Sequence, residues 1–283
     1  MSETYGALLR AATEQLKAAS IDHPAHEARR LVLLASGLSP AALIAQEQDE
    51  AADTHREALT QLLEQRVQRR PFAHLAGEAD FYGLTVKSDA RALIPRADSE
   101  CVVDAALALI PETAAWRIAD LGTGPGALLA AILHHRPDAV GMAVVASGEA
   151  SALAAENFAR LQLADRIELY TGSWATWTGW QSCDLIVSNP PYIRSDTLMT
   201  LEPEVRDYDP HLALDGGPDG LVSYRELIGL AAGQMKPGAH LVLEIGYDQK
   251  DAVSGLLERH GFANLTHYKD LGGHDRGIAA LKT

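Results

Sequence analysis

Residues 117–135, RIADLGTGPGALLAAILHH, combine a short apolar strand, a glycine-rich turn and an apolar helix. Their lengths and apolar content predict the strand over Arg117–Leu121 and the helix over Ala127–His135. The glycines of the turn, Gly122–Gly126, let the backbone pass close to a ligand. In open α/β sheets such a turn lies at the carboxyl edge, where ligands bind. The stretch therefore predicts an α/β fold with a candidate ligand site, although a tight turn without a ligand can have a similar sequence.

Strands and helices alternate on both sides of this stretch. Beyond Pro95 the sequence predicts strands over Arg117–Leu121, Val140–Val145, Ile167–Tyr170, Asp184–Ser188 and His240–Ile245. Helices are predicted over Ser99–Leu109, Ala127–His135, Glu149–Leu161, Val222–Met235 and Gln249–His260. Two last strands, near Leu265–Tyr268 and Gly277–Leu281, are separated by a glycine-rich loop and should form an antiparallel hairpin. The alternation indicates a mostly parallel sheet of about seven strands, covered by helices on both faces.

The residues before position 71 predict a separate helical domain. Apolar residues recur at helical spacing, as in Leu8, Leu9, Ala12 and Leu16, and in Leu59, Leu62, Leu63 and Val67. Gly37 indicates one helix end, Ser39-Pro40 indicates a helix start, and we expect Pro71 to close the last helix. Four short helices would form a small all-α bundle over residues 1–71.

Residues 72–95 differ in character from both neighbouring regions. They are punctuated by glycine and rich in aromatic and β-branched residues, which suits a short β-hairpin. The sequence thus predicts three parts: a helical domain over 1–71, a hairpin linker over 72–95 and an α/β domain over 96–283.

Composition restricts the classes of function. Of the 283 residues, 47% are hydrophobic, and no unbroken apolar run is long enough for a membrane helix. The start, MSETYGALLRAATEQ, has neither the basic head nor the apolar core of a signal peptide, so we expect a cytoplasmic location. Cys101 and Cys183 lie too far apart to suggest a disulfide or a metal site. A formal net charge of −14 opposes non-specific binding to nucleic acid.

A second motif, Ser188-Asn189-Pro190-Pro191-Tyr192, directly follows the strand that ends at Ser188. Two successive prolines fix φ and remove two backbone donors, so the carbonyls of the turn become acceptors toward a neighbouring pocket. An amide NH₂ placed there could donate one hydrogen to the Asn189 side-chain oxygen and the other to the Pro190 carbonyl. Tyr192 could pack on the flat amide or face a cationic methyl donor. A proline-rich turn that only ends a strand is the alternative, which the glycine-rich turn one strand earlier makes weaker.

The order of these motifs resembles the PrmC/HemK family of peptide chain release factor N5-glutamine methyltransferases. The resemblance covers nearly the whole chain and rests on PFAHLAG (71–77), IPRADSE (94–100), DLGTGPG (120–126), SNPPYI (188–193) and VRDYDPHLALDGGPDGLVSY (205–224). It implies a class I methyltransferase fold, S-adenosylmethionine as the methyl donor, and the glutamine of a release factor GGQ motif as the acceptor. Within IPRADSE, Arg96 and Glu100 could approach the donor or form an ion pair within a helix.

The resemblance also implies roles for individual residues. The donor would lie against Gly122, Thr123, Gly124, Pro125, Gly126 and Asn189 and would have Trp174 beside its adenine. The acceptor amide would be held by Asn189, Pro190, Pro191 and Tyr192, while the helical domain helps to grip the release factor. Of the clustered tryptophans Trp174, Trp177 and Trp180, only Trp174 matches the family position.

Two positions depart from what this family usually has. Its second strand commonly ends in an acid that accepts hydrogen bonds from the ribose of the donor, and the matching residue here is Val145. A second acid commonly precedes the tryptophan, where this chain has Ser173. A lost bond to a charged acceptor is worth about 1.5 to 3 kcal/mol, so we expect donor binding to be weakened roughly 10- to 150-fold. Glu149 could reach the ribose instead, or only add favourable charge to a helix start.

Other functions remain open from the residues alone. An Asn-Pro-Pro-Tyr turn can also hold the exocyclic amine of a flipped adenine, as in nucleic-acid N6-methyltransferases. The acidic net charge and the lack of a target-recognition domain disfavour that reading and any direct nucleic-acid binding. A catalytically weakened homologue that only binds release factors is a second alternative, because of Val145 and Ser173. A dehydrogenase would need a different glycine spacing and would leave the proline turn unexplained.

Overall fold

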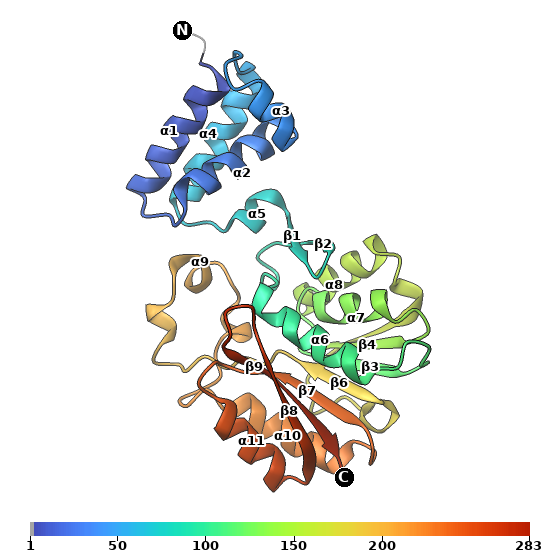
Figure 1. The fold of residues 1–283 in the computed structure, drawn as a ribbon. Coiled ribbons are helices and arrows are strands. Elements are labelled where there is room, and N and C mark those ends of the chain that lie inside the picture. The colour runs from blue at the N-terminus through green and yellow to red at the C-terminus, as the bar shows by residue number, and fades with distance from the viewer. Residues whose placement is uncertain (1–2) are drawn as a thin grey trace. The chain divides into compact units, whose positions relative to one another are not determined.

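The computed structural model describes residues 3–283, which form two compact units. The first, here called the helical unit, contains the residues up to Gly77 together with Pro203–Tyr208. The second, the sheet unit, contains Glu78–Glu202 and Asp209–Thr283. Met1 and Ser2, with which the predicted helical domain begins, lie outside the described residues. Figure 1 shows the elements of each unit by label and colour.

The helical unit contains the four helices that the apolar spacing predicts. They are α1 (Tyr5–Ala18), α2 (Pro24–Ser36), α3 (Pro40–Ala45) and α4 (Asp53–Val67), and they are followed by a short α5 (Phe72–Ala76). Ser39 caps α3 by accepting a hydrogen bond from the Ala42 amide, and Gly37 ends α2 in the left-handed conformation at φ 66°. We expected Pro71 to close the last helix, but α4 already ends at Val67. Pro71 is instead the N-cap of α5.

A late segment of the chain also belongs to the helical unit. Helix α9 (Pro203–Arg206) contributes Glu204, whose carboxylate accepts hydrogen bonds from Arg66 at 3.0 Å and Arg69 at 2.9 Å. The Tyr208 hydroxyl donates to the carbonyl of Gln68 at 2.8 Å. Arg66 is buried and pairs with Glu27 as well, at 3.0 Å. The sequence predicted only a long loop here, because the partners are more than 130 residues apart.

The sheet unit is built on a seven-stranded sheet with the order β5-β4-β3-β6-β7-β9-β8. Its strands are β3 (Arg117–Leu121), β4 (Val140–Val145), β5 (Ile167–Thr171), β6 (Leu185–Ser188), β7 (His240–Glu244), β8 (Phe262–Lys269) and β9 (Asp275–Lys282). The first five pair in parallel, and β9 runs antiparallel to both β7 and β8. The predicted fold class is thereby confirmed, including the hairpin at the end. The chain reverses strand order between β3 and β6, where open sheets bind ligands.

Helices cover both faces of this sheet, as Figure 1 shows, with α6, α7 and α8 on one side and α10 and α11 on the other. Their bounds are α6 (Glu100–Leu109), α7 (Ala127–His135), α8 (Gly148–Arg160), α10 (Val222–Gln234) and α11 (Lys250–Arg259). Successive strand residues point to opposite faces, so Ile118 joins the core under α6 and α7 while Ala119 joins the core under α10 and α11. Strands buried on both faces explain the unbroken apolar runs in the sequence.

The hairpin expected over 72–95 occupies a shorter range. Strands β1 (Glu78–Phe81) and β2 (Leu84–Lys87) pair antiparallel across a turn that contains Gly83 at φ 77°. Residues 72–76 form α5 instead of strand, and residues 88–95 form no regular element. None of the helices within residues 3–283 is long and apolar enough to cross a membrane.

Candidate active site

The glycine-rich turn leaves β3 in a conformation that only glycine adopts freely. Gly122, Gly124 and Gly126 all have positive φ, at 82°, 54° and 87°. A side chain at Gly126 would collide with Phe158, whose ring lies 2.5 Å from the position of an added Cβ. At Gly122, by contrast, the nearest atom to such a Cβ belongs to the Trp174 ring, 3.8 Å away. Trp174 therefore lies next to Gly122, which is itself exposed.

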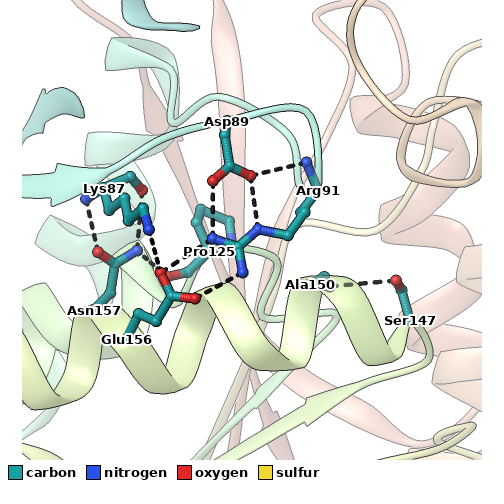
Figure 2. A network of polar contacts seen from close by, with 8 residues as sticks. All are labelled: Lys87, Asp89, Arg91, Pro125, Ser147, Ala150, Glu156 and Asn157. Carbon is teal, nitrogen blue, oxygen red and sulfur yellow. Dashed lines mark hydrogen bonds and ion pairs between the residues drawn. The ribbon is translucent and has the colours of Figure 1, made fainter. Parts of the chain in front are cut away.

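Helix α8 braces this turn from behind through Asn157, which is fully buried. Figure 2 shows its amide nitrogen donating to the carbonyls of Pro125 and Lys87, at 2.9 Å and 3.1 Å, and its oxygen accepting from the Lys87 amide at 2.7 Å. Asn157 was not predicted from the sequence, although a polar residue on the apolar face of a helix is a detectable signal. One side chain thus joins the Pro125 carbonyl to the backbone of Lys87, with one hydrogen bond to Pro125 and two to Lys87.

Asp120 supplies an unused acceptor at the start of the turn. Its Oδ2 accepts a 2.7 Å hydrogen bond from the Thr123 hydroxyl, while its Oδ1 is buried and has no hydrogen-bond partner among residues 3–283. Burial raises the pKa of the Asp120 carboxyl to about 6, against the lowering effect of Thr123. An unpaired buried oxygen is costly, so a ligand that brings a hydrogen-bond donor would relieve that cost.

The end of β4 is apolar where the resemblance leads one to expect an acid. Val145 is 7% exposed and packs against Ala92, Ala150 and Leu153. Glu149 lies exposed in the first turn of α8. Ser173 uses its hydroxyl locally, as an acceptor for the Ala175 amide at 3.1 Å. The end of β4 therefore offers no carboxylate in place of the acid that the resemblance implies.

The other two tryptophans of the cluster belong to the core. Trp177 and Trp180 are buried, with ring centroids 5.5 Å apart, and Trp180 donates its indole N–H to the carbonyl of Trp174 at 3.3 Å. Trp174 is only partly buried. This arrangement leaves Trp174 as the tryptophan that faces the turn.

The proline motif begins beside the glycine-rich turn. Ser188, the last residue of β6, donates its hydroxyl to the carbonyl of Leu121 at 2.5 Å. Asn189 follows, and its amide nitrogen donates to the Ser99 hydroxyl oxygen at 3.2 Å. With its nitrogen engaged in this way, Asn189 keeps its side-chain oxygen as an acceptor. Pro190 is buried and Pro191 is partly buried.

Glycines and a glutamine from the later chain hold the motif in place. An added Cβ at Gly216 or Gly220 would lie 2.7 Å or 2.5 Å from the backbone of Tyr192. Gln249 donates from Nε2 to the carbonyls of Tyr192 and Gly220, at 3.0 Å and 3.1 Å. The glycines within VRDYDPHLALDGGPDGLVSY thus allow the backbone of this stretch to approach the backbone of Tyr192 closely.

The Tyr192 side chain points toward a buried carboxyl group. Its hydroxyl donates to Glu244 Oε1 at 3.2 Å and accepts from Arg276 at 3.5 Å. Burial is the main reason that the pKa of Tyr192 is raised, and the nearby Glu244 charge acts in the same direction. Burial also raises the pKa of Glu244, to about 7. Glu244 and Ser99 were not anticipated from the sequence, although an acid at the end of the apolar strand His240–Glu244 is a visible signal.

The ion pair between Arg96 and Glu100, one of the two readings left open by the sequence, does not form. Arg96 pairs instead with buried Asp209 at 2.6 Å, and Glu100 accepts a hydrogen bond from the Tyr82 amide at 2.9 Å. Helix α6 begins only at Glu100, so Arg96 precedes the helix and cannot pair along its surface.

Two family models match the chain. Residues 7–77 match the PrmC N-terminal domain, and residues 101–206 match the methyltransferase small domain. A release factor glutamine methyltransferase of Caulobacter vibrioides is 42% identical over 272 residues, which are 96% of this chain and 94% of that protein. The chain belongs to the release factor glutamine methyltransferase family. The relative of that name from Cereibacter sphaeroides is 40% identical and covers 96% of both chains.

A solved structure with a related name was also found. It is the release factor-specific protein-(glutamine-N5) methyltransferase from Alicyclobacillus acidocaldarius, which is 29% identical to this chain. The match covers 67% of this chain and 94% of that chain, with a TM-score of 0.40. The family assignment rests on the full-length relatives, which share both the helical and the sheet region with this chain.

Proposed function

We propose that this protein transfers a methyl group from S-adenosylmethionine to the side-chain amide nitrogen of a glutamine in peptide chain release factors, the glutamine of the GGQ motif. The observation that carries the proposal is the bond between Ser188 and Leu121, which sets the Asn189 turn directly beside the glycine-rich turn. Relatives that are up to 42% identical bear the name of this activity. Since release factors work on ribosomes, the cytoplasm is the compartment we propose.

The residues around the glycine-rich turn fit the donor. Gly122, Thr123, Gly124, Pro125 and Gly126 would line its methionine part, and the partly buried Trp174, which lies next to Gly122, would contact its adenine ring. The unpaired Asp120 oxygen could accept a hydrogen bond from a bound amine. When bound, S-adenosylmethionine supplies an electrophilic methyl group on a sulfonium sulfur. Val145 and Ser173 offer no carboxylate to the ribose, so we propose a weaker affinity than a site with both acids would have.

The turn Asn189–Tyr192, here called the acceptor turn, would orient the glutamine amide, which is a poor nucleophile. Asn189 would accept one amide hydrogen through its side-chain oxygen and Pro190 the other through its carbonyl. These acceptors favour a pyramidal nitrogen, whose lone pair is then available for the methyl group, and the nitrogen would release one of its two protons to water once the new bond has formed. Pro191 fixes the turn and Tyr192 flanks the amide, so that proximity and orientation supply much of the rate.

The helical unit supports a role in substrate recognition. Residues 7–77 match the N-terminal domain model of this family and include no residue of the glycine-rich turn or of Asn189–Tyr192. We propose residues 1–71 as a domain that grips the release factor, 72–95 as the link, and 96–283 as the domain that transfers the methyl group.

The test is an incubation of the purified protein with isotopically labelled S-adenosylmethionine and a release factor, followed by peptide mass analysis. The account predicts one methyl group on the glutamine of the GGQ peptide. The same mixture with bulk nucleic acid in place of the release factor should acquire no label. Methylation of adenine without any methylation of glutamine would instead favour the nucleic-acid enzyme. Binding of the release factor without transfer to it would indicate a homologue that has lost activity.

A further inference from the structure

A carboxyl group without a role in the proposed transfer lies behind the acceptor turn. Glu244, the last residue of β7, is 2% exposed, and its backbone carbonyl accepts a 2.9 Å hydrogen bond from the Tyr224 hydroxyl. Its side-chain Oε1 accepts from Tyr192, while Oε2 is buried without a hydrogen-bond partner among the described residues. Burial of a carboxylate costs free energy unless hydrogen bonds or opposite charges compensate for it, which makes Glu244 a candidate for a functional role.

Ser99 links the same carboxyl group to Asn189. The Ser99 oxygen accepts the hydrogen bond from the Asn189 amide nitrogen, so the Ser99 hydroxyl hydrogen remains available to point elsewhere. The Ser99 hydroxyl lowers the pKa of the Glu244 carboxyl group, and the unpartnered Oε2 of Glu244 is an acceptor toward which it could turn. The Asn189–Tyr192 turn therefore contacts Glu244 directly at Tyr192, and Ser99 could provide a second link at Asn189.

We propose that ionised Glu244 is the positioning residue of the acceptor turn. Its carboxylate accepts a hydrogen bond from the Tyr192 hydroxyl, and it would accept a second from Ser99, which holds the Asn189 amide nitrogen and so leaves the Asn189 oxygen free. This inference rests on the proposed function for its consequence in catalysis, but the coupling between Glu244 and Tyr192 is a property of the protein alone. Glu244 itself does not touch the acceptor amide in this account.

Ionisation of Glu244 should then control the rate. The charged or titratable groups that face it come from several elements and include Asp98, Cys101, Tyr192, Tyr224 and Arg276. Burial outweighs the lowering effects of Ser99, Arg276 and Tyr192, and the pKa of Glu244 lies at about 7. Below that pH the protonated carboxyl is a weaker acceptor for Tyr192 and Ser99, so kcat should rise as pH increases through neutrality.

The experiment compares Glu244→Gln with wild type and with Asp184→Asn. Asp184 is a carboxylate at the opposite edge of the same sheet, where it accepts from the Arg117 amide and from Lys236. We expect Glu244→Gln to lower kcat about 10- to 100-fold, the loss typical for a hydrogen bond to a charged group, and to abolish the rise near neutral pH. The affinity for S-adenosylmethionine, measured by calorimetry, should stay within about twofold of wild type. Asp184→Asn should keep the pH profile of wild type.

A profile for Glu244→Gln that still rises near neutral pH with unchanged kcat would overturn the proposal. Equal losses of donor affinity and of kcat would also overturn it, because they would indicate general damage to the fold.

A second measurement needs no turnover. Carbon-13 labelling of glutamate side chains lets NMR follow the ionisation of Glu244, whose signal is assigned as the one missing in Glu244→Gln. Tyr192→Phe removes a hydrogen bond to the ionised form, so the midpoint of this titration should move to higher pH. An unchanged midpoint would contradict the coupling. If the midpoint moves but wild type methylates no glutamine, the proposed function fails while the link between Glu244 and Tyr192 stands.

Discussion

The hydroxyl of Ser188 donates a 2.5 Å hydrogen bond to the carbonyl of Leu121. Each residue is buried and stands immediately before one of the two turns of the site. Strands β3 and β6 are neighbours in parallel, with Asp120 opposite Val187, so both turns leave the sheet at the same edge. The closeness of the donor and acceptor positions is therefore a property of the sheet and not of mobile loops.

Ser188→Ala should loosen this junction without altering either turn in sequence. The Leu121 carbonyl would lose a partner in a buried place, which costs about 1 to 3 kcal/mol in the free energy of unfolding. Urea denaturation measures that loss. We expect kcat to fall as well, since misplacement of the acceptor affects the rate strongly. Unfolding and kinetics both equal to wild type would show that the strand pairing alone sets the geometry.

Val145→Asp should strengthen binding of S-adenosylmethionine. The new carboxylate could accept the ribose hydroxyls, and the expected gain is roughly 10- to 150-fold in Kd by isothermal titration. Val145→Leu serves as the apolar control and should show no gain. Tight binding by the unmodified chain would refute the weakened site, and an aspartate variant that binds no better would remove its stated cause.

Glu149→Gln tests whether another acid replaces the missing one. Glu149 is exposed in the first turn of α8, where a negative charge is favourable for the helix. We expect the affinity for the donor to remain unchanged in a titration of this variant. A marked loss of affinity would instead identify Glu149 as the ribose acceptor.

Asn157→Ala should weaken the glycine-rich turn from a distance. The buried Pro125 carbonyl and the backbone of Lys87 would lose their partner, at a cost of about 1 to 3 kcal/mol in the free energy of unfolding. Donor affinity should fall because the Pro125 carbonyl is no longer held. The neighbouring Glu156→Gln is a matched control, since its ion pairs with Lys87 and Arg91 lie at the surface (Figure 2) and contribute little. Equal effects of the two variants would contradict the special role of Asn157.

Stability should depend on pH through Glu244. The pKa of its carboxyl group is about 7 in the folded protein, against 4.5 for the unperturbed group, so the folded state binds the proton more tightly. The stabilisation is present below the unfolded value and is lost as pH rises through about 7. Wild type should therefore lose thermal stability relative to Glu244→Gln between mildly acidic and mildly alkaline buffer. Parallel melting temperatures across this range would show that Glu244 is not protonated near neutrality.

The fold could be predicted from local sequence to a large extent. Strands Arg117–Leu121 and Val140–Val145 and helix Ala127–His135 have the predicted bounds, because apolar runs and glycine ends are local signals. Helix α9 could not be predicted in this way, since its contacts with Arg66 and Arg69 join distant parts of the chain.

The candidate site follows the same division. Each turn was visible as a short motif, and parallel pairing explains why the two lie together. The residues that hold the two turns in place could not be predicted. Asn157 contacts Lys87 across 70 residues, and Glu244 contacts Tyr192 across 52 residues. The partner of Arg96 could not be predicted for the same reason, since Asp209 is 113 residues away.

The most direct test of the account is the amount of methyl group transferred to the GGQ glutamine by wild type and by Asn189→Ala, measured by peptide mass with saturating donor. Removal of one preorganised polar group that acts in the transition state typically costs about 100- to 1,000-fold in rate. We predict such a loss for Asn189→Ala, with a much smaller change in the affinity for S-adenosylmethionine. Glutamine methylation by Asn189→Ala at the rate of wild type would contradict the role of the turn in presenting the amide.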